Sequence, residues 1–131
     1  MAYNASKIKI IVNGVFLTGF RDGDIYSYEE GEDRFTRYEG VDGAIDYSER
    51  AGNPCTITIG LKNNSPSNKI LDDLYQNREE LDITIKDDND SGKTISATDA
   101  VIMRRPDESK AKEIGENEWV FDCPEHSVNY K

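Results

Sequence analysis

The seven residues Thr56-Ile57-Thr58-Ile59-Gly60-Leu61-Lys62 carry the clearest structural pattern in the chain. An isoleucine or leucine fills every second position, and small or polar residues fill the positions between them. Successive side chains of a β-strand point to opposite faces, so this alternation predicts a strand with one buried face. The pattern therefore indicates a fold built on half-buried β-strands.

A helix is predicted directly after this strand. Ser65 can cap its first turn, and Pro66 suits the first helical position because its φ angle is fixed near the helical value. Apolar residues between Ile70 and Leu74 form a stripe along one side, and the helix is expected to end before Asn77.

Further strands are predicted on both sides of this strand and helix. Asn13-Gly14 lies between two apolar runs and is typical of a tight hairpin turn, in which both central residues need a positive φ. Alternation, or turn residues at both ends, predicts other strands at residues 8–12, 24–29, 34–39, 44–48, 81–86, 94–104 and 118–123. The expected total is about seven to eight strands.

These elements predict a mainly β chain, an antiparallel β-barrel or β-sandwich with one flanking α-helix. A length of 131 residues suits a single domain over residues 1–131. Within it, residues 1–6 are expected to form an N-terminal arm and residues 124–131 a C-terminal tail. The charged segment 105–117 is predicted to be a loop or a weak helix.

The composition disfavours several classes of protein. With 26 acidic and 16 basic residues the formal net charge is −10, which repels phosphates and disfavours stable nucleic-acid binding. No apolar run approaches the roughly 20 residues of a membrane helix, so membrane insertion is not expected. The first seven residues lack the layout of a signal peptide, and two cysteines do not make a disulfide framework. We therefore expect a chain made in the cytoplasm, with reduced thiols.

Residue types that carry chemistry are few. His126 is interpreted as a surface histidine in a polar tail, and Cys55 and Cys123 as small hydrophobic residues of the core. Residues 87–92 resemble a calcium loop, but the twelfth position holds Thr98 where such a loop needs a bidentate glutamate. An acidic hairpin turn is the favoured interpretation. The sequence therefore predicts no catalytic group, no metal site and no cofactor.

Aromatic residues are frequent on the polar strands between residues 24 and 48. Such strands bury little apolar area on their own and suit partial cover by a partner. An ordinary two-faced antiparallel sheet explains them equally well, so both interpretations stay open. Exposed strand edges can pair between chains, and a repeated contact of this kind can close into a ring. The aromatic residues are Tyr26, Tyr28, Phe35, Tyr38 and Tyr47.

Several segments, taken in order, resemble one family. Residues 7–24, KIKIIVNGVFLTGFRDGD, are similar to the opening of bacteriophage tail tube proteins, and residues 56–68, TITIGLKNNSPSN, are the most similar segment. The order of the segments carries the resemblance, which extends from about residue 7 to residue 123. Its other matching positions are Glu32-Asp33, Gly40, Gly43, Leu71, Leu74 and residues 118–121.

The resemblance implies a structural subunit with neither enzymatic activity nor a cofactor. Six copies would form a ring, and stacked rings would form the tail tube of a long-tailed phage with a contractile sheath. The implied partners are other copies of the chain, the sheath protein outside, and the tape-measure protein and transiting DNA inside. Baseplate or initiator and terminator proteins would bind at the ends. The protein would be located in the virion tail, after assembly in the cytoplasm of the host bacterium.

Two sets of residues are expected to act in such a tube. An acidic lumen would keep DNA phosphates off the wall. The stretch from Gly40 to Asn53 is long and polar enough to reach a neighbouring ring, and the arm of residues 1–6 could contact an adjacent subunit. The lumen candidates are Glu29, Glu30, Asp46 and Asp82. The candidates for contacts between subunits or rings are Tyr3, Tyr38, Gly40, Asp42, Tyr47 and Arg50.

Two other functions remain as alternatives. One is a ring-forming tube protein of a contractile secretion or injection machine. The other is a monomeric β-sandwich that binds a carbohydrate or peptide through its tyrosines. An enzyme comes last, because the sequence offers neither an oriented base nor a metal site.

Overall fold

The fold is mainly β, with one helix. The computed structural model describes residues 8–21, 25–31, 33–88, 92–106 and 115–130. The helix α1 spans Ser67–Gln76, between β6 and β7. The strands of the described residues are β1 (Ile8–Val12), β2 (Val15–Phe16), β3 (Tyr26–Glu30), β4 (Phe35–Glu39), β5 (Ile45–Glu49), β6 (Cys55–Lys62), β7 (Leu81–Asp87), β8 (Lys93–Ile102), β9 (Glu116–Cys123) and β10 (Glu125–Tyr130). The predicted mainly β class with one helix is confirmed.

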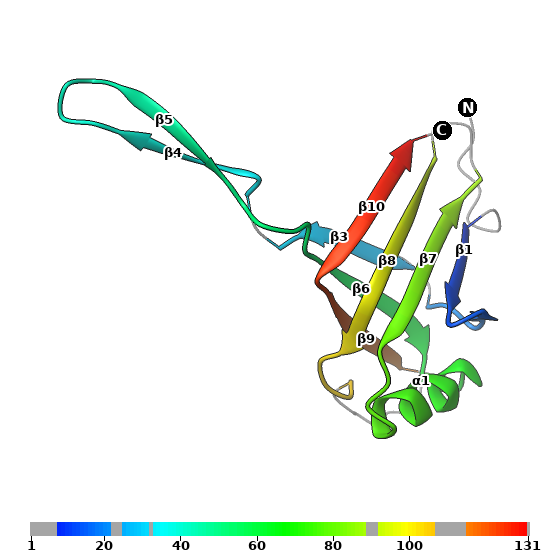
Figure 1. The fold of residues 1–131 in the computed structure, drawn as a ribbon. Coiled ribbons are helices and arrows are strands. Elements are labelled where there is room, and N and C mark those ends of the chain that lie inside the picture. The colour runs from blue at the N-terminus through cyan, green and yellow to red at the C-terminus, as the bar shows by residue number, and fades with distance from the viewer. Residues whose placement is uncertain (1–7, 22–24, 32, 89–91, 107–114, 131) are drawn as a thin grey trace.

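Eight strands form two packed layers that share β8. The front sheet has the order β2-β1-β7-β8-β10, and the rear sheet consists of β3, β6, β9 and the end of β8. Figure 1 shows the strands of the two layers crossing at a steep angle. The order of the described strands has free ends at β2 and β3, so the architecture is an open sandwich rather than a closed barrel.

A bulge lets β8 belong to both sheets. Leu81 of β7 pairs with Ala100, but Ile83 pairs with Ala97, so β8 holds an extra residue at this point. Asp99 takes a φ of 56°, which bends the strand. After the bend, Val101 and Ile102 pair with β9.

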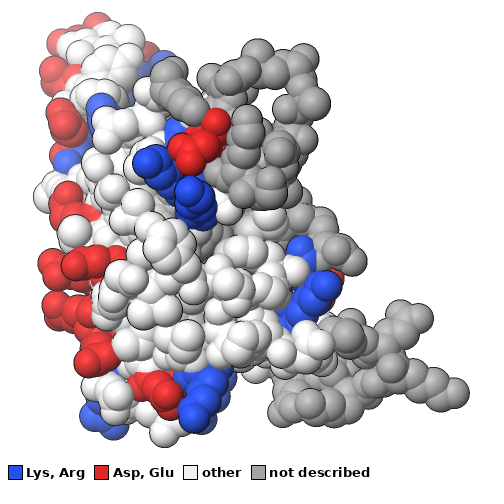
Figure 2. Space-filling model, turned by 90° about the vertical axis from the view of Figure 1, so that its right-hand side faces the viewer, with Lys and Arg blue, Asp and Glu red and all other residues white. Residues whose placement is uncertain are grey.

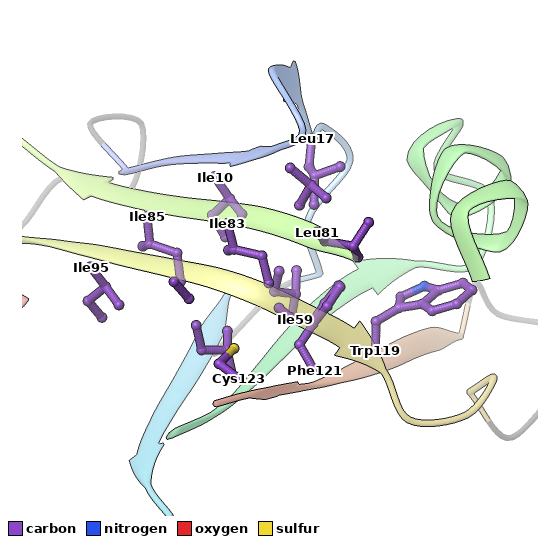
Figure 3. Close-up of a cluster of buried hydrophobic side chains, with 14 of the residues drawn as sticks. Ile10, Leu17, Ile59, Leu81, Ile83, Ile85, Ile95, Trp119, Phe121 and Cys123 are labelled. Carbon is purple, nitrogen blue, oxygen red and sulfur yellow. The ribbon is translucent and has the colours of Figure 1, made fainter. Parts of the chain in front are cut away.

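The core lies between the sheets and is closed at one end by α1. Alternate residues of β1, β6, β7, β8 and β9 point inward, as the sequence pattern predicts, and Leu71 of α1 is fully buried. Figure 3 shows Trp119, Phe121 and Cys123 of β9 projecting from one strand into this cluster. The Trp119 Nε1 donates a hydrogen bond to Asn68 Oδ1 at 3.0 Å, which attaches α1 to the rear sheet.

The C-terminal segment is not the polar tail that the sequence predicts. Residues 125–130 form β10, which pairs with β8 along six residues, from Glu125↔Thr98 to Tyr130↔Lys93. His126 is 7% exposed and points inward, so its interpretation as a surface histidine is wrong. The strand was missed because its inward positions hold only His126 and Val128, which give too little apolar alternation.

The ends of two other elements differ from the prediction by a few residues. The helix begins at Ser67, so Pro66 lies at the N-cap position, one residue before the predicted place. Ser65 still serves this end of the helix, because its Oγ accepts a hydrogen bond from the Ser67 backbone N–H. β9 begins at Glu116, so the predicted loop 105–117 ends earlier than expected.

Some predictions lie outside the described residues. These are the arm of residues 1–6 with Tyr3, most of the segment 105–117, and the centre of the acidic turn after Asp87. In the described ranges, no group of histidine, cysteine or carboxylate side chains is arranged to hold a metal ion. No helix among the described residues is both long and apolar enough to span a bilayer.

Two glycines with positive φ give a matched stability test. Gly14 (φ 81°) occupies the predicted Asn13-Gly14 turn, where an added Cβ meets nothing, whereas at Gly19 (φ 72°) it would lie 2.7 Å from the Ser65 Cβ. We expect Gly14→Ala to cost about 1 kcal/mol of unfolding free energy, from backbone strain alone. Gly19→Ala should cost at least about 2 kcal/mol, because Ser65 must also move from its hydrogen bonds. Urea denaturation of both variants measures the difference, and equal losses would contradict it.

Candidate assembly surfaces

The strands β4 and β5 form a separate two-stranded ribbon that extends away from the body (Figure 1). They pair in register from Phe35↔Glu49 to Glu39↔Ile45, and every residue of both strands is exposed. The tip of the ribbon is a turn in which the Asp42 Oδ1 accepts a hydrogen bond from the Ala44 backbone N–H at 3.1 Å. An isolated two-stranded ribbon is marginally stable in water, so this ribbon is a candidate for contact with a partner.

The two faces of the ribbon differ in character. Directly opposed residues of an antiparallel pair share a face, so the register assigns each side chain to one of two sets. On the first face the rings of Phe35 and Tyr47 meet edge to face, with centroids 6.5 Å apart. We call this set the aromatic face; it consists of Phe35, Arg37, Glu39, Ile45, Tyr47 and Glu49. The other set is the hydroxyl face; it consists of Thr36, Tyr38, Asp46 and Ser48.

A buried histidine connects the base of the ribbon to β10. The His126 Nδ1 lies 2.6 Å from the Asn53 carbonyl oxygen, and its Nε2 lies 2.5 Å from the Tyr28 hydroxyl oxygen. A carbonyl can only accept, so Nδ1 carries a proton and donates; in the neutral imidazole Nε2 then accepts from the Tyr28 hydroxyl. Burial raises the pKa of Tyr28, and the nearby Glu30 carboxylate adds to this effect, so the hydroxyl remains a donor. In return, the Asn53 Nδ2 donates to the His126 carbonyl oxygen at 2.8 Å.

Arg50 also serves the base of the ribbon. Its side chain is 5% exposed, and the guanidinium lies 3.6 Å from the Glu30 carboxylate and donates a hydrogen bond to Asn53 Oδ1. Its backbone N–H donates to the Arg34 carbonyl oxygen at 2.9 Å, across the start of the two strands. The Arg50 side chain therefore makes its interactions within the subunit, although the sequence predicts that Arg50 contacts another subunit or ring.

The outer face of the rear sheet carries carboxylates along its length. Glu29 lies beside Thr56, which pairs with Asp122, so these three side chains share the solvent face. Further along β9, the Glu118 and Glu116 carboxylates bind the Arg21 guanidinium at 2.5 and 3.3 Å. Both bonds raise the pKa of Arg21, the Glu118 bond most strongly. Arg21 is thus neutralised in place, and a second cation of this face, Lys62, lies opposite Glu116.

A concavity of ≈660 Å³ joins this outer face to the ribbon. It is lined by Glu29, Glu30, Gly31, Asp33, Thr36, Ser48 and Arg50. Thr36 and Ser48 belong to the hydroxyl face, so that face of the ribbon and Glu29 of the rear sheet border the same concavity. Of the residues that line it, none belongs to the aromatic face.

The outer face of the front sheet has a different charge pattern. Lys9 of β1 pairs directly with Lys86 of β7, and both are exposed. Asp82 lies on the same face, nearer to the other end of β7. Figure 2 views the molecule from the side away from the ribbon and shows acidic side chains gathered along one edge, while much of the facing surface is uncharged.

A comparison with known sequences identifies the family. The family model described as "Bacteriophage PhiTE tail tube protein" matches residues 15–129. The chain belongs to this tail tube protein family. The predicted resemblance is therefore confirmed, and the tail tube protein is a structural component of a virion or tail-like particle. Among curated protein sequences, none matches the chain.

Solved structures share the fold at low sequence identity. One is a chain of a native gene transfer agent virion, with 12% identity, a TM-score of 0.67 and 99% coverage of both chains. A second is a chain of the extracellular contractile injection system PVC in its sheath-tube complex, with 16% identity, a TM-score of 0.68, and coverage of 99% of this chain and 93% of that one. A third is a chain of the PVC sheath/tube terminator structure, with 15% identity, a TM-score of 0.69, and coverage of 98% and 97%.

The predicted lumen residues of the tail tube protein fall on three surfaces. Glu29 lies on the outer face of the rear sheet, and Asp46 lies on the hydroxyl face of the ribbon. Glu30 lines the concavity between them but is bound to Arg50. Asp82 lies on the front sheet, on the opposite side of the sandwich. The structure therefore brings Glu29 and Glu30 together at the concavity, places Asp46 further out on the ribbon, and separates Asp82 from all three.

Sequence reasoning missed Glu118 and Asp122 on the same outer face as Glu29. The signal is present, because Trp119, Phe121 and Cys123 alternate inward and leave these carboxylates pointing outward. Of the predicted contact residues, Tyr38 and Tyr47 lie on opposite faces of the ribbon, and Gly40 and Asp42 form its tip turn.

Proposed function

We propose that this tail tube protein assembles into stacked rings of six copies that form the conduit for genome delivery. The observation that supports the proposal is the exposed β4–β5 ribbon, which extends beyond the sandwich and exposes large apolar side chains. The chain that carries this ribbon belongs to a tail tube family. Phe35, Val41, Ile45 and Tyr47 are each at least half exposed, as expected of a surface that other copies cover.

The proposed partners follow from this assembly. Other copies of the chain supply the main contacts, a sheath protein surrounds the tube, and the tape-measure protein and then DNA occupy the lumen. Initiator or baseplate and terminator proteins bind the ends, and assembly takes place in the host cytoplasm. The subunit acts without enzymatic activity or a cofactor.

The outer face of the rear sheet is proposed to line the lumen. It presents Glu29, Glu118 and Asp122, and its Arg21 is already bound by two carboxylates. The front sheet would instead present Lys9 and Lys86 side by side, a pair that would bind and retain phosphates. On this proposal Glu29 and Asp46 line the channel, whereas Asp82 faces away from it.

A second candidate is the tube protein of a contractile injection machine. The similarity in fold to chains of the PVC structures favours it. The two candidates share the assembly and differ in cargo. A tape-measure gene and capsid genes beside the coding sequence would identify the phage.

Replacement of the ribbon tests the assembly. A variant in which Phe35–Glu49 is replaced by a short Gly-Ser linker should keep the melting temperature of the wild-type body, because none of the replaced residues belongs to the core. Wild-type protein at rising concentration should form rings or tubes in negative-stain images and in light scattering. The variant should remain monomeric.

Two outcomes would contradict the proposal. One is a wild-type chain that stays monomeric at all concentrations and salts. The other is a folded variant without the ribbon that assembles as well as the wild type.

A further inference from the structure

We propose that the β4–β5 ribbon has a fixed sidedness in the assembled tube: its aromatic face docks on a second copy of this chain, and its hydroxyl face lines the channel. The inference rests on the proposed tube function and assigns a different role to each face of the same ribbon. It separates Tyr47 from Tyr38, which the sequence alone treats as equivalent.

The direction of the hydroxyl face carries the first step. Thr36 and Ser48 line the concavity of ≈660 Å³ together with Glu29 of the rear sheet. Asp46 and Tyr38 pair with each other two residues further out on the same face. The surface from Glu29 to Asp46 is therefore continuous, hydroxyl-rich and acidic. Such a surface repels phosphates and suits the wall of a channel for DNA.

The composition of the aromatic face carries the second step. Phe35, Ile45 and Tyr47 are 54%, 51% and 66% exposed, and no element of the described subunit covers them. Arg37 lies opposite Tyr47 in the middle of this face, and Glu49 and Glu39 lie opposite Phe35 and Ile45. Exposed apolar and aromatic side chains next to charged residues of both signs suit a contact with another protein.

The family identifies the occupant as another copy of the chain. A tube is a polymer of one subunit. A contact between two identical surfaces would end at a dimer, so the contact that builds a tube must join two different surfaces of the subunit. The side of the body away from the ribbon offers a surface of suitable character. Figure 2 shows much of this side uncharged. The body also exposes Val15 and Phe16, at 40% and 58%, on β2, the edge strand at the opposite end of the strand order from β3.

Two tyrosines of similar exposure give a matched pair of variants. Tyr47 is 66% exposed on the aromatic face and Tyr38 is 59% exposed on the hydroxyl face of the same ribbon. Tyr47→Ser should raise the protein concentration needed for assembly by at least about tenfold, as truncation of an interface hot spot does. Tyr38→Ser should change it by less than about threefold. Light scattering across a dilution series measures both values.

Thiol labelling gives a second measurement that does not depend on the strength of assembly. Ile45 and Asp46 are consecutive residues on opposite faces, and both are exposed in the subunit. In assembled tubes, Ile45→Cys should become protected from a small maleimide, whereas Asp46→Cys should stay reactive through the channel. The native thiols give little background, because Cys55 and Cys123 are 1% and 0% exposed. Unassembled protein provides the reference in which both new thiols react.

The outcomes separate this inference from the tube function itself. Tubes in which Asp46→Cys is protected and Ile45→Cys reacts would overturn the sidedness and leave the tube function intact. Equal effects of Tyr47→Ser and Tyr38→Ser on assembly would also overturn it. A wild-type chain that never assembles would remove the tube function and this inference with it.

Discussion

Phe121→Ala should lower the free energy of unfolding by about 3–5 kcal/mol, a large part of the stability of a domain this size. Phe121 is 0% exposed and pairs with Ile57 of β6 and with Ile102 at the end of β8. Its ring occupies the space where the two sheets meet, as Figure 3 shows. Removal of the ring leaves a cavity that rigid neighbouring strands cannot fill.

The matched control makes the same chemical change on the ribbon. Phe35 is 54% exposed, so Phe35→Ala should cost less than about 1 kcal/mol in the unassembled subunit. Urea denaturation at protein concentrations below the assembly threshold measures both variants. Similar losses for the two changes would contradict the assignment of Phe121 to the core.

The alternating segments of the sequence were sufficient to predict the sandwich core. Thr56–Lys62 and Glu118–Cys123 appear in the structure as the paired strands β6 and β9, with the predicted residues inward. Asn13-Gly14 forms the expected turn, with φ angles of 50° and 81°. These predictions succeed because period-two burial and positive φ are local properties of the chain.

The division into two sheets depends on a shift in the phase of the buried positions within β8, which a simple strand prediction omits. The inward positions of β8 change phase between Ala97 and Ala100, and this shift is the bulge that carries the strand from one sheet to the other. The sequence contains the shift, but a single run of residues 94–104 hides it. The choice between barrel and sandwich therefore needed the pairing partners.

The assembly surfaces were predictable in composition but not in placement. Acidic strand residues and exposed tyrosines can be found from the sequence, yet the face that each occupies depends on its partner strand. β4 pairs with β5 and leaves the body, so Tyr38 and Tyr47 point in opposite directions. The sequence predicts the same role for Asp82 and Glu29, because both are outward on their own strands, but those strands belong to different sheets.

His126→Leu is expected to give the second large loss of stability, about 2–4 kcal/mol. The imidazole donates to the Asn53 carbonyl oxygen and accepts from the Tyr28 hydroxyl, and the residue is 7% exposed. Leucine can fill most of the space but leaves both partners without a hydrogen bond in a partly buried site. An unsatisfied buried polar group costs about 1–3 kcal/mol, and two such groups give the expected loss.

A double-mutant cycle with Tyr28→Phe isolates the contact between the two side chains. Tyr28→Phe removes the hydroxyl, so adding it to His126→Leu should recover about 1–2 kcal/mol. Only the Asn53 carbonyl oxygen then lacks its partner, and the remaining loss should reflect that group. A coupling free energy below about 0.5 kcal/mol would show that the hydroxyl does not depend on His126.

The pH dependence of the same variants provides an independent test of this contact. Burial raises the pKa of Tyr28 above its usual value of 10.0, so the folded chain holds this proton more tightly than the unfolded chain. The protonated Tyr28 hydroxyl therefore contributes its full stabilisation of the folded chain below pH 10. This contribution is lost as the pH rises through the pKa of Tyr28 in the folded chain. Tyr28→Phe should therefore lessen the fall in stability above pH 10. If the free energy of unfolding falls equally steeply above pH 10 in the wild type and in Tyr28→Phe, the pKa of the Tyr28 hydroxyl is the same in the folded and unfolded chains. That result would contradict the prediction.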